Sequence, residues 1–95
     1  MNIRVNILPE GIVLDASSCT EDTAEIVVGL RVELAKLAQG EYRYTDVIIR
    51  ANPVVLAFLR LIRWDAIFDF QEINEGNLVT HEKRQAYTFN DNGVR

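Results

Sequence analysis

Apolar and polar residues alternate at the start of the chain. Between residues 2 and 8 every odd position is apolar, and the even positions before Leu8 are polar, which is typical of a β-strand with one buried face. Pro9-Glu10-Gly11 follows and favours a tight turn, because proline fixes φ and glycine accepts positive φ. We therefore expect residues 12–16 to form a second strand, paired with the first as a hairpin.

The next apolar residues recur with the period of a helix. From about residue 21 to residue 39 they form one stripe on a helical wheel. The stripe consists of Ile26, Leu30, Leu34 and Leu37. At the start of this helix, Ser18 with Glu21 three residues later fits a capping box, and Thr20 and Asp22 are alternative caps.

A continuous apolar run predicts the third strand. Residues 44–51 contain three β-branched residues in a row at 47–49, a pattern that favours a central strand or burial on both faces. Asn52 and Pro53 follow; asparagine is a strong N-cap, and proline is favoured at the first helical position. We therefore expect a second helix from this point to about Trp64.

Two further strands complete the pattern. Residues 65–73 alternate again, residues 74–77 have the composition of a turn, and residues 78–89 form a long, mostly polar last strand. We expect residues 90–95 to fray. Because no linker and no internal repeat interrupts the pattern, residues 1–95 are predicted to form a single domain.

This order of elements, β-β-α-β-α-β-β, predicts an α/β fold, with α+β as the alternative. Each β-α-β unit joins two parallel strands through a right-handed crossover. The hairpins at both ends add antiparallel strands. The expected architecture is a mixed sheet with two helices packed on it.

The second predicted helix carries more apolar residues than one sheet can bury. At about 100° per residue its apolar arc exceeds roughly 200°, whereas a helix on a sheet needs an apolar stripe of little more than about 100°. On the helical wheel Leu56 lies between Arg60 and Arg63 on the remaining side. The excess indicates contact with the first helix, with the last strand or with a second copy of the chain.

We interpret this surface as the interface of a homo-oligomer, most simply a homodimer. The expected interface residues are Phe58, Leu59, Ile62, Arg63 and Trp64. Aromatic residues and arginine are enriched at protein interfaces, arginine because its planar head offers several hydrogen-bond donors. The alternative interpretation is a small core wrapped tightly by its own second helix.

Charge and composition restrict the classes of partner. The chain has 95 residues and a net charge of −4, which argues against broad nucleic-acid binding, since that needs a basic surface. Its single cysteine, Cys19, allows no intramolecular disulfide and favours a reducing compartment. No apolar run approaches the roughly 20 residues that span a bilayer, and the start of the chain lacks the apolar core of a signal peptide. We expect a cytoplasmic protein without a membrane partner.

An anion-binding site is the strongest hypothesis about a ligand. The carboxyl ends of parallel strands and the N-termini of the following helices should meet at one edge, where free N–H groups favour negative charge. The expected ligand-binding residues are Ser17, Ser18, Thr20, Arg50 and Asn52. Since Ser, Thr and Asn before helices are commonly caps, the competing interpretation is that they only cap the helices.

The remaining reactive residues predict no catalytic site, no metal site and no cofactor. Cys19 precedes a helix, where a thiol pKa can be lowered, but a free cysteine more commonly packs as a small apolar residue. His81 has Glu82 as its neighbour, and adjacent strand residues point to opposite faces. One histidine and one cysteine are too few for a zinc site within one chain.

The layout of the chain, with its LPEG hairpin and a strand that enters an apolar helix through proline, resembles the small CRISPR-associated ring nucleases. The resemblance implies nuclease activity as one form of a phosphoester-handling function. That family depends on histidines near its second helix, where this chain has Leu61, Arg63 and Trp64. No residue role or activity is therefore carried over.

Taken together, the sequence predicts a small self-associating interaction or regulatory module that acts by binding and not by catalysis. The alternative is a nucleotide- or phosphoester-binding protein that uses the strand-end edge. A further protein partner of unidentified kind is compatible with the same apolar surface.

Overall fold

The computed structural model describes residues 1–40, 42–74, 76 and 78–85. They form a five-stranded mixed sheet and two α-helices, which confirms the expected α/β fold. The strands are β1 (Arg4–Leu8), β2 (Gly11–Asp15), β3 (Val47–Ala51), β4 (Asp69–Ile73) and β5 (Val79–Glu82). The helices are α1 (Thr23–Ala38) and α2 (Pro53–Leu61), with short 3-10 turns η1 (Tyr44–Asp46) and η2 (Trp64–Ala66).

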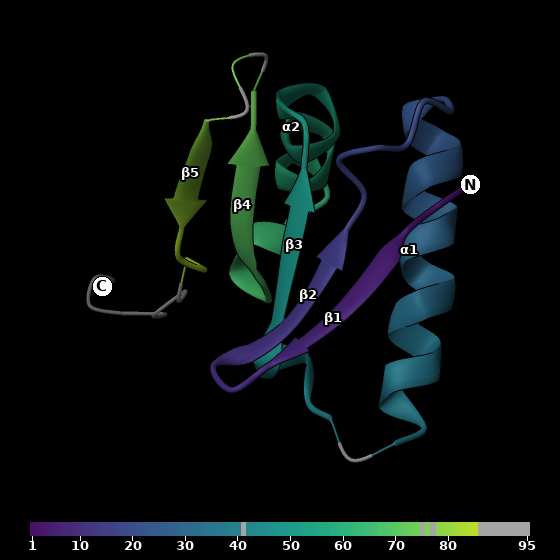
Figure 1. Ribbon diagram of the computed structural model, residues 1–95, viewed down its shortest axis with the longest axis vertical. Helices are drawn as coiled ribbons and strands as arrows, with labels where there is room; N and C mark the ends of the chain where they lie inside the picture. Colours follow the sequence, from purple (N-terminus) through teal and green to yellow (C-terminus); the bar gives the residue numbers. More distant parts are fainter. Residues whose placement is uncertain (41, 75, 77, 86–95) are drawn as a thin grey trace, which may run out of the picture.

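The strands lie in the sheet in the order in which they occur in the chain. β2, β3 and β4 are parallel neighbours, while β1 and β5 pair antiparallel at the two edges. Since the strand order continues in one direction, crossovers of the same hand place α1 and α2 on the same side of the sheet. Figure 1 shows both helices behind the five strands. We call this the helix side, and the other the bare side, because no helix or strand of the described residues covers it.

The hydrophobic core fills the space between the sheet and the helices. From the sheet it takes Leu14, Val47, Ile49, Ala51 and Phe70, and from the residue before β4 it takes Phe68. From the helices it takes Ile26, Val27, Leu30 and Leu34 of α1 and Val55, Leu56 and Leu59 of α2. The core therefore uses mainly one face of each element, although Val13 of β2 is also buried, on the opposite face of the sheet.

Within the described part of the chain, neither helix is both long and apolar enough to cross a bilayer.

The two helices differ in how they begin. The α2 start is as expected: Pro53 is its first residue, and the Asn52 Oδ1 atom accepts a hydrogen bond of 2.9 Å from the Val55 backbone N–H. At the start of α1, Asp22, one of the two alternative caps, is the N-cap in place of Ser18, and the helix begins at Thr23. The backbone forms a turn before it, where the Cys19 N–H donates to the Ala16 carbonyl at 3.1 Å.

The second helix ends three residues earlier than the expected end at Trp64. It stops at Leu61, and Arg63 has a left-handed backbone conformation with φ of 67°, a conformation that cannot continue a right-handed helix. η2 follows where the alternation predicted the start of a strand, and β4 begins only at Asp69. Similarly, η1 replaces the first three residues of the strand that was expected over residues 44–51.

The buried face of α2 is rotated relative to the prediction. The helical wheel puts Leu56 between Arg60 and Arg63, on the side away from the core. In the structure Leu56 is fully buried together with Val55 and Leu59. Arg60 extends to the edge strand, where its Nη2 atom lies 2.6 Å from the Glu82 Oε1 atom. Its guanidinium lies 5.7 Å from the centroid of the buried Phe70 ring, so the side chain packs along the core side of the sheet.

The last strand is shorter than expected within the described residues. β5 spans Val79–Glu82, whereas the sequence predicted a strand over residues 78–89. The rest of that prediction from residue 86 on, and the predicted frayed tail at residues 90–95, lie outside the described residues. After β5 the chain remains attached to the domain, since the Gln85 N–H donates to the Asp65 carbonyl at 2.7 Å.

Candidate functional site

The carboxyl ends of the three parallel strands meet at one edge, as the anion-site hypothesis requires. A shallow cavity of about 830 Å³ lies there, between the segment after β2, the start of α2 and the end of β4. Its polar lining includes Ser17, Asn52 and Asn74, and its apolar lining includes Val54 and Leu78. The edge thus brings together two of the five predicted ligand-binding residues.

The polar groups at this edge are engaged with their own chain. The Ser17 hydroxyl and backbone N–H both donate to the Asp15 Oδ1 atom, at 2.6 and 2.9 Å. The Asn52 oxygen caps α2. Ser18 and Thr20 are exposed, and neither side chain makes a hydrogen bond to another described residue. Asn52 thus matches the competing interpretation of a helix cap, whereas Ser17 caps no helix and forms a local turn with Asp15 instead.

Arg50 does not present an unpaired positive charge at the edge. Its Nη1 atom lies 3.6 Å from the Asp15 Oδ2 atom, and its Nε–H donates to the Gln71 Oε1 atom at 2.8 Å. Asp15 therefore stands between Ser17 and Arg50 and brings a negative charge to the place where an anion would have to bind. This arrangement stabilises the arginine but opposes the binding of a phosphate or carboxylate.

Asp15 and Arg50 belong to a larger set that the sequence analysis missed. The strand register aligns one residue from every strand across the bare side, and we call this set the polar row. The polar row consists of Arg4, Asp15, Arg50, Gln71 and His81. Asp15 and Gln71 are only 9% exposed although no element covers them. Each strand contains at least one polar residue, but the alignment of one from each strand needs the register, which composition does not give.

The predicted reactive residues do not meet. Cys19 is buried in the core as a free thiol, as expected for a small apolar residue. His81 lies exposed in β5, at the far end of the polar row from Arg4. Among residues 1–40, 42–74, 76 and 78–85, no group of three or more metal-ligating side chains comes together.

The residues of the predicted interface are divided between the core and the surface. Leu59 is fully buried in its own chain and Trp64 is half-buried against the core, whereas Phe58 and Ile62 remain exposed. Arg63 lies 3.4 Å from Asp65, measured from its Nε atom to the carboxylate Oδ1 atom. Leu59 is thus unavailable to a partner, while Phe58 and Ile62 are available.

Two other α2 residues, which are absent from the predicted interface, are more exposed than any of the predicted interface residues. The Val54 side chain is 68% exposed and the Leu61 side chain is 79% exposed. With Phe58 and Ile62 they occupy positions i, i+4, i+7 and i+8, which form one stripe on a helix. We call Val54, Phe58, Leu61 and Ile62 the α2 outer stripe.

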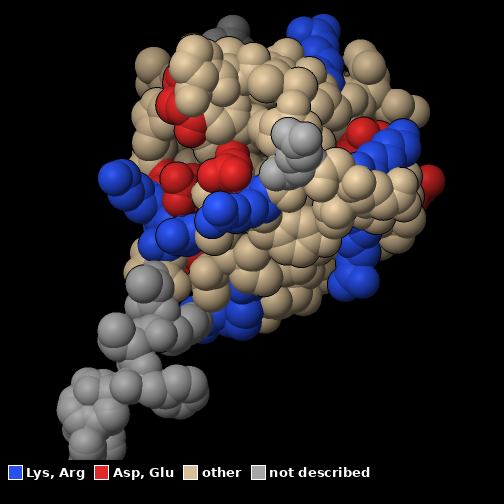
Figure 2. All heavy atoms as spheres, turned by 90° about the horizontal axis from the view of Figure 1, so that it is seen from below, with Lys and Arg blue, Asp and Glu red and all other residues tan. Residues whose placement is uncertain are grey.

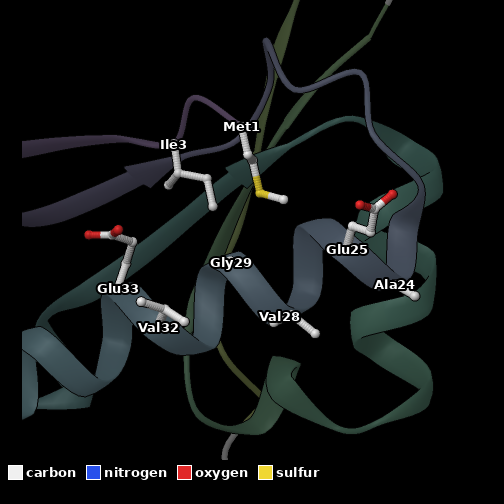
Figure 3. A pocket seen from close by; sticks show the side chains of 8 residues that line it. All are labelled: Met1, Ile3, Ala24, Glu25, Val28, Gly29, Val32 and Glu33. Carbon is white, nitrogen blue, oxygen red and sulfur yellow. The ribbon is translucent and has the colours of Figure 1, made fainter.

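A second apolar surface lies along α1. The segment before β1 lies across the middle of this helix, and Figure 3 shows Met1 and Ile3 directed towards it, with Glu25 and Glu33 on either side. A cavity of about 500 Å³ lies there. A Cβ atom on Gly29 would come within 2.5 Å of the Met1 sulfur, so a larger residue there would displace the Met1 side chain.

The charged surface is mixed in sign. In the view from below, basic and acidic side chains lie next to each other and do not separate into patches of one sign (Figure 2). A hydrogen bond to Glu82 raises the pKa of Arg60 above its ordinary value. A hydrogen bond from its own backbone amide lowers the pKa of the Glu21 carboxyl. On the face that Figure 2 shows, this mixture of charges leaves no extended basic patch for a nucleic-acid backbone among the described residues.

The chain has no match among models of protein families, curated proteins or solved structures. The resemblance of its layout to ring nucleases therefore carries no argument about activity. Any functional conclusion rests on the geometry of the chain itself.

Proposed function

We propose that the protein is a self-associating interaction module and that a second copy of the chain binds to the α2 outer stripe. The observation that carries this proposal is the exposure of Val54 and Leu61, the most exposed large apolar side chains of the helix pair. Exposed apolar stripes of this kind mark protein contacts, because each side chain gains free energy when it leaves water.

The neighbouring helix also exposes apolar residues, which line the second apolar surface beneath Met1 and Ile3. Val28 and Val32 of α1 point away from the core and are also exposed, and α1 and α2 lie against each other in one layer. A contact that covered outward residues of both helices would approach the area of a standard protein interface more closely than α2 alone.

A second copy is the occupant that fits best. A two-fold symmetric contact places the same patch on both partners, so the patch must be complementary to itself. A stripe without charges meets this condition, since no like charges are brought together. The flanking Arg60 is already paired with Glu72 and Glu82 in its own chain, so a partner need not supply a carboxylate for it.

The test is the molecular mass in solution over a concentration series, measured by size-exclusion chromatography with light scattering. The wild-type chain of 10.8 kDa should give a dimer that dissociates on dilution. Leu61→Glu places a charge in the stripe and should raise the dissociation constant by about tenfold or more, because a buried leucine contributes about 1.5–3 kcal/mol.

Ile7→Glu is the matched control, because Ile7 is another exposed apolar residue but lies in the edge strand β1. This variant should associate like the wild type. A wild-type chain that remains monomeric at the highest concentration would contradict the proposal, and so would a Leu61→Glu variant that dimerises as strongly as the wild type.

The nucleotide- or phosphoester-binding alternative draws less support from the geometry. Arg50 is paired with Asp15, and the Asn52 oxygen is used as a helix cap. A thermal-shift screen with nucleotides, with and without divalent metal, tests it directly. A rise in the melting temperature that Arg50→Ala abolishes would favour this alternative, whereas an unchanged melting temperature would count against it.

A further inference from the structure

A cavity of about 370 Å³ lies away from the strand-end edge, where α1 approaches η1 and η2. Its lining consists of Arg31, Leu34, Tyr44, Trp64, Ile67 and Phe68, and we call it the aromatic pocket. The volume is within the range of cavities that hold small molecules. Neither the strand-end site nor the α2 outer stripe accounts for it.

Three of the six lining residues are aromatic: Tyr44 comes from η1, and Trp64 and Phe68 come from the segment before β4. The Phe68 ring is buried, and its centroid lies 5.6 Å from those of both Tyr44 and Trp64. The Trp64 ring meets it edge to face at 63° and the Tyr44 ring is tilted by 54°. Such tilted arrangements are favourable for aromatic pairs, and a further flat ring can join them in the same way.

The polar groups of the lining are hydrogen-bond donors. The Arg31 guanidinium lies 6.0 Å from the centroid of the Trp64 ring, within reach of a cation–π interaction. Within the described part of the chain, no ion pair involves Arg31, and no hydrogen bond involves its guanidinium, the Tyr44 hydroxyl or the Trp64 indole N–H. Arginine and the indole can only donate, so the complementary ligand must offer acceptor oxygens.

We propose that the aromatic pocket binds a small planar aromatic carboxylate. The flat ring of such a ligand would pack against Tyr44, Trp64 and Phe68, and its carboxylate would pair with Arg31, whose planar fork matches a carboxylate. The pocket thereby supplies a positive charge that no described carboxylate offsets, in a chain whose net charge is −4. This site does not depend on the self-association through α2.

The test uses the full chain and the indole N–H resonance of Trp64, which is the only tryptophan of the sequence and therefore needs no assignment. The protein is titrated with benzoate, with benzamide and with cyclohexanecarboxylate. Benzoate should shift this resonance to saturation. Benzamide lacks the charge, so its dissociation constant should be about fivefold higher than that of benzoate. This factor corresponds to the loss of an ion pair of about 1 kcal/mol.

Two variants separate local recognition from net charge. Arg31→Gln should weaken benzoate binding by about fivefold and bring it to the level of benzamide. Arg4→Gln removes the same charge from the bare side of the sheet and should leave benzoate binding unchanged.

The proposal is overturned by any of three results. These are the absence of a saturable shift with benzoate, a loss of binding in Arg4→Gln as large as in Arg31→Gln, and binding of cyclohexanecarboxylate as tight as that of benzoate. The second result would mean that only the total charge matters, and the third that the aromatic rings recognise nothing specific.

Discussion

The two sides of the sheet use the same strands for different purposes. On the helix side, every second residue of β3 enters the core, and Ile49 is fully buried beneath the helices. On the bare side, the residues between them include Ile48 and Arg50, which are only partly buried. Because successive side chains of a strand point to opposite faces, two adjacent residues of the same strand lie in different environments.

The difference shows that burial on this domain has two sources. The helix side is buried by packing against α1 and α2, which stabilises apolar side chains. On the bare side, Asp15 and Gln71 are shielded by their neighbours in the polar row and satisfied by Arg50 and Ser17. Polar side chains can therefore be buried without cover, provided that hydrogen bonds replace the water they lose.

The largest effect is expected from truncating the helix side. Ile49→Ala should lower the free energy of unfolding by about 2–5 kcal/mol, because it leaves a cavity in a packed core. Ile48→Ala is the same change one residue earlier, on the bare side, and should cost less than half as much, since Ile48 is partly exposed and its neighbours can adjust. Chemical denaturation of both variants gives the comparison.

Equal losses for the two variants would contradict the distinction between the sides. That result would mean that the bare side is packed as tightly as the core, and hence that it is covered in solution. The wild-type midpoint and slope serve as the reference for both curves.

A smaller effect is expected from breaking the polar row. Asp15→Ala removes the acceptor of both Ser17 hydrogen bonds and the partner of Arg50. It should lower the free energy of unfolding by about 1–3 kcal/mol, the cost of leaving partly buried donors unsatisfied. In a double-mutant cycle with Ser17→Ala the two losses should not add, because both remove the same bond. Additive losses would show that the hydrogen bond between the Ser17 hydroxyl and Asp15 does not contribute to stability.

The smallest effect is expected at the ion pair that joins α2 to β5. Glu82→Gln weakens the contacts of the Arg60 guanidinium with Glu82, at 2.6 and 3.3 Å, and both side chains are about one-third exposed. The loss should be less than about 1 kcal/mol and should shrink at high salt, which screens exposed pairs. Denaturation at low and high salt measures it. A loss of stability that does not depend on salt would mean that this ion pair is shielded from solvent.

The sign of the pH dependence follows from the pKa of Arg60. Glu82 raises this pKa above its ordinary value, so the pair stabilises the fold as long as the pH is below the pKa of an unfolded arginine. Its contribution is lost only when the pH rises through the still higher pKa of the folded state. The difference between wild type and Glu82→Gln should therefore be constant from neutral to moderately alkaline pH.

Most of the architecture could be predicted from periodicity. The alternation before Leu8, the helical stripe of α1 and the Asn52-Pro53 start of α2 are local signals, and each gave the correct element. The order of these elements then restricts the topology to a mixed sheet with parallel central strands. The fold was predictable because local preference and global arrangement agree at these positions.

The errors occurred where tertiary contacts override local pattern. The left-handed conformation of Arg63 ends α2, and nothing in the residue type predicts it, since glycine or asparagine is usual there. Leu56 faces the core because the helix is positioned by α1 and the sheet, and a helical wheel alone does not fix that rotation. Residues outside a local window determine both features.

The candidate sites were harder to predict than the fold. Ser17 and Arg50 were recognised as neighbours at the strand-end edge, but the carboxylate of Asp15 between them was not. The aromatic pocket gave no sequence signal at all, because Arg31, Tyr44 and Trp64 are distant in the chain. Such sites form where residues that are distant in the chain come together in the fold. No periodic pattern in a single sequence shows which residues these are.

The coincidence of strand order with chain order has a consequence for how the domain assembles. Every strand finds its partner in the strand made immediately before it, so the sheet can grow from one edge without inserting a late strand between two earlier ones. The edge hairpin β1–β2 closes a short loop, whereas the parallel pairings β2–β3 and β3–β4 each close a longer one that contains a helix. A polypeptide arranged in this way can assemble progressively as it leaves the ribosome.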